Sequence, residues 1–256
     1  MITSPTTEVP VRRRSILGLA LITLVMVSVL TSLGIWQLHR RDEKHALIAA
    51  LTERLAASPE ALAPSSEWKT LDPPHDEFRR VILTGTFAAK PDAMVYSSGS
   101  AVREDVSGPG TWAFMPAQLP DGSVVVINAG FAQNTMQDRA QQDRAVARLI
   151  TGAPLKLTGY IRFPEQRGWL TPHQDTAKRL WFLRDHVAMA QALGWGTVAP
   201  FYIDLESPVP SSGVPKPGPL TVHLKDDHMQ YAITWFGLAL VVAAAFGFWV
   251  ASQRRS

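Results

Sequence analysis

The chain carries two long apolar runs, SILGLALITLVMVSVLTSLGI at residues 15–35 and YAITWFGLALVVAAAFGFWVA at residues 231–251. Neither run holds a charge, and each has about 21 residues, which a helix rising ~1.5 Å per residue needs to cross ~30 Å of hydrocarbon. We therefore expect a membrane protein whose two transmembrane helices form a hairpin. Residues 36–230 are then expected on one side of the membrane, as one β-rich (α+β) extramembrane domain.

Positive charge in the tails predicts the orientation. Arginines occupy residues 12–14 before the first run and residues 254–255 after the second. Short Arg-rich flanks stay in the cytoplasm. We therefore expect a multi-pass protein of a bacterial plasma (inner) membrane, with cytoplasmic tails at residues 1–14 and 252–256 and a periplasmic domain. The tails carry +4 (five Arg less Glu8) of a total net charge of +3, so no basic surface remains for nucleic acid.

The first run is expected to remain as an anchor, not to be cleaved as a signal peptide. It is longer than the ~7–15-residue apolar core of a signal peptide, and TSLGIWQ at residues 31–37 offers no small-x-small cleavage site. The chain has no cysteine, so the domain must be stabilised by its hydrophobic core, without disulfides or thiolate metal sites.

Apolar patterning predicts the elements of the domain. The first helix continues past the membrane, because Leu47, Ile48, Leu51 and Leu55 recur at helical spacing. Residues 57–74 are rich in Pro and Ser and are expected to be irregular. Asp185 fits the N-cap of a short helix that ends at Gly194. Strands are expected at residues 78–87, 93–97, 111–119, 123–128, 155–162, 179–183 and 201–205, helices at 133–150 and 186–193, a hairpin turn at 120–122 and a stiff Pro-rich linker at 207–219.

Three segments together resemble the surfeit locus protein 1 family, the assembly factors of cytochrome c oxidase. The first is LGIWQLHRRDEK, which matches the family's exit from the first helix through Gly34, Trp36, Gln37, Arg40 and Lys44. The second is the set LTGTF, DGSVVVINAGF, GYIRFPE and WFLRD within the domain. The third is HMQYAITWFGLA, which follows the family pattern at nearly every position. The chain departs from the family where Asp226-Asp227 precedes the histidine and where NAGFA, at residues 128–132, lacks an Arg and a Trp.

The resemblance implies a chaperone of respiratory chain biogenesis that binds haem a at the outer membrane edge. It would aid insertion of the haem into the large oxidase subunit, with that subunit and the haem a synthesis machinery as partners and the lipid membrane as its location. Imidazole is a usual axial ligand of haem iron, so His228 at the membrane edge is the candidate metal ligand. Arg40 and Lys44 are candidate partners of the haem propionates.

The second apolar helix offers a face for such a planar ligand. Positions 228, 232, 235, 239 and 242 share one helix face, which reads His, Ala, Trp, Ala and Val. The predicted haem contacts are therefore His228, Tyr231, Ala232 and Trp235. His39 lies at a similar depth and is a weaker candidate for a second axial ligand.

Structural roles remain open for the same residues. A histidine at a membrane interface serves as a polar anchor in many proteins, and Trp36, Tyr231 and Trp235 fit an aromatic belt. Arg40 and Lys44 fit snorkelling charges. The alternative function is then a non-haem membrane scaffold that stabilises an oxidase assembly intermediate.

Small residues also allow two interpretations. Ser28 and Ser32 in the first helix and Ala239, Ala243 and Gly247 in the second form faces that permit close packing, either with each other or with an oxidase subunit. In the domain, Gly85, Gly130 and Gly159 are expected at turns or bulges.

No motif of an enzyme is present. The chain has no G-x-S-x-G, no H-E-x-x-H and no phosphate-binding glycine loop. In WFLRD, Trp181, Arg184 and Asp185 are interpreted as packing and capping residues. We therefore predict a protein without catalytic residues.

Overall fold

The computed structural model describes residues 11–100, 102–133, 139–221 and 226–255. Contacts divide the chain into two compact units, Met1–Ile48 with Lys225–Ser256, and Ala49–Leu224. The first unit holds most of helix α1 (Val11–Ala56) and helix α5 (His228–Arg255). The second holds the last turns of α1 and the β-rich domain.

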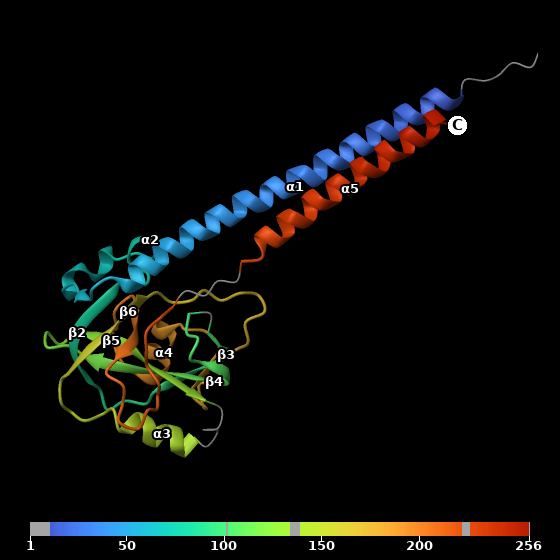
Figure 1. The fold of residues 1–256 in the computed structure, drawn as a ribbon. Coiled ribbons are helices and arrows are strands. Elements are labelled where there is room, and N and C mark those ends of the chain that lie inside the picture. Colours follow the sequence, from blue (N-terminus) through green and yellow to red (C-terminus); the bar gives the residue numbers. More distant parts are fainter. Residues whose placement is uncertain (1–10, 101, 134–138, 222–225, 256) are drawn as a thin grey trace, which may run out of the picture. The chain divides into compact units, whose positions relative to one another are not determined.

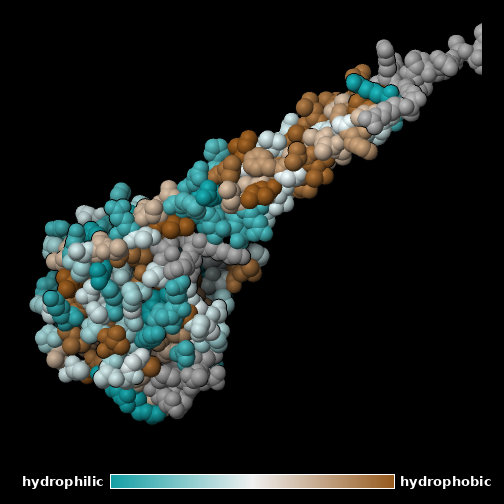
Figure 2. Space-filling view, viewed as in Figure 1, coloured by the Kyte–Doolittle hydropathy of each residue, from teal (hydrophilic) through white to brown (hydrophobic). Residues whose placement is uncertain are grey.

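Helices α1 and α5 are long and apolar enough to cross a membrane, as the two runs predict. Figure 2 shows hydrophobic side chains gathered over both helices. Helix α1 runs without interruption to Ala56, which confirms the continuation predicted from leucine spacing. The boundaries of membrane-embedded segments and tails stay a prediction.

The domain contains eight strands in its described part (Figure 1). Four strands form its first half: β2 (Arg80–Phe87), β3 (Ala93–Gly99), β4 (Ser107–Gln118) and β5 (Val124–Gln133). The others are β6 (Leu155–Arg162), β8 (Tyr202–Ser207) and two short strands, β1 (Glu60–Ala61) and β7 (Leu180–Trp181). The helical elements are a 3₁₀ helix (Ser65–Thr70), α2 (Pro73–Asp76), α3 (Arg139–Ala147) and α4 (His186–Leu193).

Five of these strands close into a ring. The order is β2, β6, β8, β5 and β4, and β4 returns to β2 through the pairs Thr86–Gln118 and Phe87–Ala117. Strands β5 and β8 run parallel, whereas the other pairs in the ring are antiparallel. Closure leaves no free edge within the ring, and β1, β3 and β7 extend the sheet beyond it.

Alternating side chains of the strands fill two cores. One core includes Val81, Met115, Ile127 and Leu157, all fully or almost fully buried. The second lies on the other face of β4 and β5, where Met189 of α4 packs with Trp112 and Tyr202. Burial of these apolar side chains is the main stabilising contribution available to a domain without disulfides.

Local sequence signals are confirmed at the hairpin and at α4. Leu119 and Ser123 are bonded across the turn, and Gly122 has φ +85°, a conformation that favours glycine. Asp185 Oδ1 accepts the N–H of Ala188 at 3.0 Å, and Gly194 ends α4 with φ +66°.

Several strand ends differ from the prediction; for example, β3 extends to Gly99 and β4 begins at Ser107. Strand β2 starts at Arg80 because Phe78 has φ +66°, which interrupts an extended chain. Strand β5 extends to Gln133, and only Leu180–Trp181 of residues 179–183 is a strand. Part of the predicted helix 133–150, residues 134–138, lies outside the described residues, and α3 covers Arg139–Ala147.

The Pro-rich segment differs from the predicted extended linker, because residues 215–220 pack against the domain. Lys216 exchanges both backbone hydrogen bonds with Phe131. Arg103, only 2% exposed, donates to the carbonyls of Pro217 and Gly218 at 3.3 and 3.4 Å and pairs with Asp105 at 2.6 Å. Proline has no N–H, and here the carbonyl groups of the segment supply the polar contacts.

The three singled-out glycines have different roles. Gly130 has φ +127°, and a Cβ there would lie 2.3 Å from the backbone of Lys216. Gly159 lies at a bulge, where a Cβ would lie 2.4 Å from Asp204 O. Gly85 pairs regularly with Leu155 inside β2, so the expected turn or bulge is wrong there.

Candidate functional site

Four polar side chains meet within the helical unit. Gln37 and His45 come from α1, and Asp226 and His228 come from the start of α5. His228 Nδ1 lies 2.8 Å from Gln37 Oε1, and His45 Nε2 lies 2.6 Å from Asp226 Oδ2. These contacts join the beginning of α5 to two points on α1 that are about two helical turns apart.

The contact with Gln37 defines the protonation pattern of His228. An amide oxygen only accepts hydrogen bonds, so the proton lies on Nδ1 of His228 and is donated to Gln37 Oε1. In the neutral ring, the lone pair is then on Nε2. Metal-binding histidines use this same arrangement, because the second hydrogen bond orients the ring and raises its basicity.

Asp226 completes the start of α5. Its Oδ1 accepts the backbone N–H of His228 at 3.0 Å, so its negative charge lies at the positive end of the helix. The pKa of Asp226 is lowered, first by this hydrogen bond and then by the His45 side chain. An ionised carboxylate therefore lies beside His228 without taking either of its ring nitrogens.

A contact between α1 and α5 lies beside part of the predicted haem face. Gly34 is buried, and a Cβ there would lie 2.7 Å from the ring of Phe236. Ala232 and Ala239 flank Phe236 along the same stripe of α5 and are 1% and 6% exposed. Two positions of the predicted haem face, Ala232 and Ala239, are therefore buried, whereas Trp235 and Val242 on the same face are partly exposed.

Other predicted contacts remain accessible. Tyr231 is 54% exposed and Trp235 is partly exposed. Trp36 on α1 is also exposed. The aromatic residues near His228 therefore present ring surface outside the helix–helix contact, in agreement with either a ligand-binding role or an aromatic belt.

The cationic candidates lie on α1 beyond Gln37. Arg40 pairs with Glu43 at 2.9 Å, and both side chains are largely exposed. Lys44 is half-buried, and His39 is exposed. The structure brings Gln37 to His228, whereas no contact described here joins Arg40 or His39 to that histidine.

Most of the small residues lie outside the helix contact. Ser28 and Ser32 are exposed, and Ser32 Oγ donates to the Ser28 carbonyl. Gly247 has no atom within 4 Å of its would-be Cβ, and Ala243 is exposed. Of the predicted packing residues only Ala239 is buried, so the others are left on the outer surface of the pair.

His228 fits the role of a ligand to haem iron. The predicted flat face fits a haem less well. Nε2 of His228 has the lone pair that iron requires. The available ring surface comes from Tyr231 and Trp235, because Ala232 is covered. Within the residues that the structure describes, no three His, Asp or Glu side chains gather as a cluster for a metal ion.

The domain contains a buried polar network. Arg162 pairs with Glu77 at 2.6 Å and with Asp204 at 2.8 Å, and Asp204 accepts from Asn128 Nδ2 at 2.6 Å. Each charge in this network has a charged partner, which is the usual condition for burial. We interpret it as structural.

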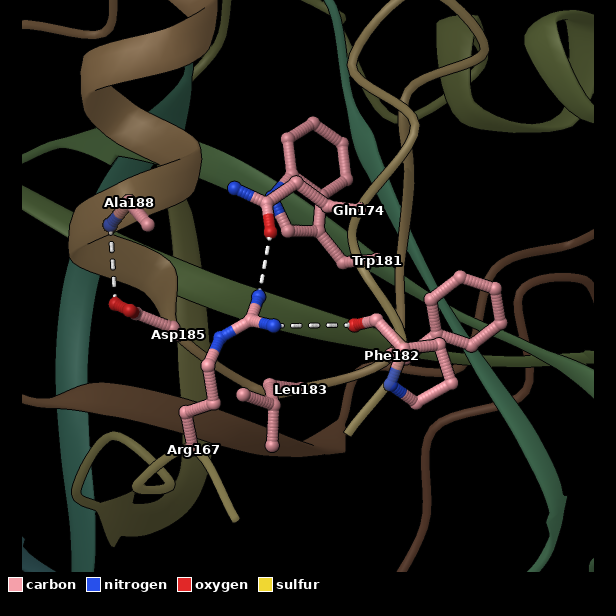
Figure 3. A pocket seen from close by; sticks show the side chains of 8 residues that line it. Arg167, Gln174, Trp181, Phe182, Leu183, Asp185 and Ala188 are labelled. Atoms are coloured by element: carbon pink, nitrogen blue, oxygen red, sulfur yellow. Dashed lines mark hydrogen bonds between the residues drawn. The ribbon is translucent and has the colours of Figure 1, made fainter. Parts of the chain in front are cut away.

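A hollow of about 140 Å³ lies between the β6–β7 loop and α4 (Figure 3). Arg167 crosses it and donates to Gln174 Oε1 at 2.8 Å and to the Pro172 carbonyl at 3.5 Å. The carboxylate of Asp185 is engaged as the N-cap of α4. The capping role predicted for Asp185 is confirmed, and Arg184 packs over the ring of Trp112 at 5.0 Å.

Sequence reasoning did not predict the contacts of Gln37, Gly34 and His45. Gln37 and Gly34 belong to the matched motif at the exit of α1, but their spacing gives no sign of which residue of α5 they meet. The partners are far apart in the chain, with 191 positions between Gln37 and His228.

Comparisons with known proteins agree with these motifs. A model described as the SURF1 family matches residues 24–240. A SURF1-like protein of Monosiga brevicollis is 29% identical over 241 residues, covering 91% of this chain and 87% of that protein. Surfeit locus protein 1 of Homo sapiens is 31% identical over 221 residues, covering 81% and 69%, and that of Rattus norvegicus is 30% identical over 219 residues, covering 80% and 67%.

Proposed function

Because the chain belongs to the SURF1 family, we propose that it is a membrane-anchored assembly factor of haem–copper cytochrome c oxidase. In this proposal it acts in a bacterial plasma membrane, with both termini cytoplasmic and the domain periplasmic. The length and apolar composition of α1 and α5 support the anchoring. The arginines of the two tails support the orientation.

The cargo in this proposal is haem a, held through Nε2 of His228. When bound, haem a supplies an iron that takes an axial imidazole. The observation that carries the proposal is the 2.8 Å contact between His228 Nδ1 and Gln37 Oε1, because a proton donated from Nδ1 leaves Nε2 free for the iron. Tyr231 and Trp235, about one and two turns along α5 from His228, offer accessible ring surface, and Arg40 and Lys44 supply positive charge for the propionates.

A single protein ligand suits transfer of the cargo. A site with one firm axial ligand releases haem more readily than a site with two, and His39 makes no described contact with His228. The partners that we propose are the large subunit of the oxidase, which receives the haem, and the haem a synthesis machinery, which delivers it. The chain itself performs no bond-forming step in this scheme.

The test is the reduced-minus-oxidised spectrum of the full protein, purified in detergent after co-expression with haem a synthesis. We expect a haem a band that His228→Ala abolishes, because the iron loses its ligand. Gln37→Ala should weaken haem retention by about 10- to 100-fold, the usual effect of losing the group that orients a metal-binding histidine.

His173→Ala is the matched control, since His173 is an exposed histidine of the domain. Its spectrum should equal that of the unaltered protein, and circular dichroism should show all variants folded. A full haem a band in His228→Ala would rule out the proposed ligand.

A second candidate function is a scaffold without haem. The observation that favours it is the outer surface of the helix pair, where Ser28, Ser32, Ala243 and Gly247 remain available for close packing with another membrane helix. In that case Ala243→Leu should block oxidase assembly, whereas His228→Ala should leave assembly intact.

A further inference from the structure

The loop between β6 and β7 exposes two large apolar side chains. Trp169 is 94% exposed and Leu170 is 74% exposed. Among the other apolar side chains described in the domain, Val209 at 59% and Tyr96 at 42% are the next most exposed. Adjacent Trp and Leu side chains exposed to this degree form an apolar feature that an apolar surface can bury with a gain in free energy.

Trp169 and Leu170 lie in a turn that hydrogen bonds hold in place. Gly168 N–H donates to Thr171 Oγ1 at 3.0 Å, and Thr171 N–H donates to the Gly168 carbonyl at 3.2 Å. Arg167 donates to the Thr171 carbonyl at 3.3 Å and to Gln174 at 2.8 Å, as Figure 3 shows for Gln174. The turn therefore holds Trp169 and Leu170 at its tip, away from the hollow that Arg167 crosses.

The chemistry of the tip suits a lipid surface. Tryptophan favours the membrane–water interface, because its ring is apolar and its N–H remains able to bond. The backbone bonds of the turn and the Arg167 contacts reduce the number of polar groups that need water, which lowers the cost of entering lipid. Glu165 and Asp175 of the loop pair with Arg184 and Lys178, and Arg167 next to the tip adds a positive charge that anionic lipid headgroups attract.

The loop begins beside the point where α1 enters the domain. Arg54, in the last turn of α1, donates to the Glu77 carbonyl at 3.0 Å, and Phe163 N–H donates to Glu77 Oε2 at 3.1 Å. Both ends of the domain, Ala49 and Leu224, continue into the unit of apolar helices. The domain is therefore tethered twice, so even a weak apolar contact acts at a high effective concentration.

We propose that the Trp169–Leu170 turn inserts into the surface of the bilayer that holds α1 and α5, as a third membrane contact of the chain. The inference rests on the proposed membrane anchoring of these helices. Insertion would limit the rotation of the domain about its two tethers. A protein surface fits the tip less well, because hot-spot aromatics of protein interfaces cluster in packed patches, whereas these two side chains project from a single turn.

The absence of cysteine from the chain permits a direct test. Leu170→Cys is labelled with an environment-sensitive fluorophore in the full protein, reconstituted into phosphatidylethanolamine–phosphatidylglycerol vesicles. We expect blue-shifted emission, quenching by spin-labelled lipid and protection from iodide. Val209→Cys is the matched control on the same domain, and its label should be quenched by iodide and not by the lipid.

Two further variants make the result decisive. Trp169→Ser combined with Leu170→Cys should lose the blue shift, because the anchoring ring is removed. Phe248→Cys on α5, where the side chain is 79% exposed, reports whether the helix lies in lipid. If the Phe248 label is quenched by lipid and the Leu170 label is not, the inference is wrong while the anchoring stands.

The remaining outcomes are also informative. If neither label is quenched by lipid, the anchoring premise itself fails. If the Leu170 label is shielded from both quenchers, a protein or a second copy covers the turn, and insertion into lipid is excluded.

Discussion

One hydrogen bond adds support to the candidate role of His228. Many histidines lie near membrane surfaces, and residue type alone does not separate a ligand from a polar anchor. The 2.8 Å contact with Gln37 Oε1 places the proton on Nδ1 and leaves Nε2 able to bind a metal. The amide of Gln37 is therefore as informative about a ligand role of His228 as the imidazole itself.

A second histidine predicts a pH dependence of the domain. His186 is fully buried, its Nε2 lies 2.9 Å from the Ala199 carbonyl, and burial lowers its pKa. The folded domain then holds His186 neutral, whereas the unfolded chain takes up a proton near pH 6.5. The free energy of unfolding should therefore fall as the pH drops below about 6.5, by up to ~1.4 kcal/mol per pH unit for one proton.

His186→Gln tests this effect, because glutamine keeps an N–H donor and does not titrate. Urea unfolding followed by near-ultraviolet circular dichroism, at pH 7.5 and pH 5, should show a smaller difference in the variant. An equal difference in both proteins would assign the pH dependence to other groups.

A glycine of α1 and an aromatic ring of α5 form a close contact between the two helices. Both helices are apolar around most of their circumference, so hydrophobic pattern alone gives little choice of contact face. Gly34 permits the ring of Phe236 to approach. The pair Gln37–His228 lies about one turn away from this contact along α1 and about two turns away along α5. The packing of the two helices therefore positions the side chains of the candidate site.

Gly34→Leu should separate the helices, because even a Cβ would lie 2.7 Å from the Phe236 ring. We expect a destabilisation of about 1–3 kcal/mol, typical of overpacking. The measurement is cross-linking by a short thiol reagent between cysteines placed at His45 and Asp226, which are in contact in the native pair.

The matched control is Gly247→Leu, since that glycine has no atom within 4 Å. Cross-linking should fall in Gly34→Leu, remain in Gly247→Leu, and recover when Phe236→Ala is added to Gly34→Leu. Equal cross-linking in all three would show that the close contact does not hold the pair.

The candidate haem-binding residues and the folded domain belong to different units of the molecule. Gln37, His45, Asp226 and His228 belong to the helical unit, whereas the ring of strands and both cores belong to Ala49–Leu224. The domain has its own buried core and its own ion-pair network, which are the requirements for independent folding.

A chain of residues 49–221 should therefore fold without the helices and should not retain haem a. Far- and near-ultraviolet circular dichroism should report a β-rich, packed domain, and the haem a spectrum should be blank. A haem a band that survives in this chain would move the site into the domain.

Sequence patterns were enough to predict the two apolar helices, most strands, the hairpin turn at Gly122 and the cap at Asp185. These features follow from composition and periodicity within short windows, so local physics is enough to predict them. His228 was also identified as a candidate from its type and place in the motif. Its tautomer could not be predicted in this way.

The contacts between distant segments could be known only from the tertiary structure. The pairs Thr86–Gln118 and Phe87–Ala117 close the ring, Arg103 holds the Pro-rich segment against the domain, and Gly34 of α1 meets the ring of Phe236 of α5. Each of these contacts depends on how whole helices and strands pack together. The periodicity of the sequence does not predict that packing. The same reason applies to Gln37 and His228, which are remote in sequence and meet because Gly34 lets two helices pack closely.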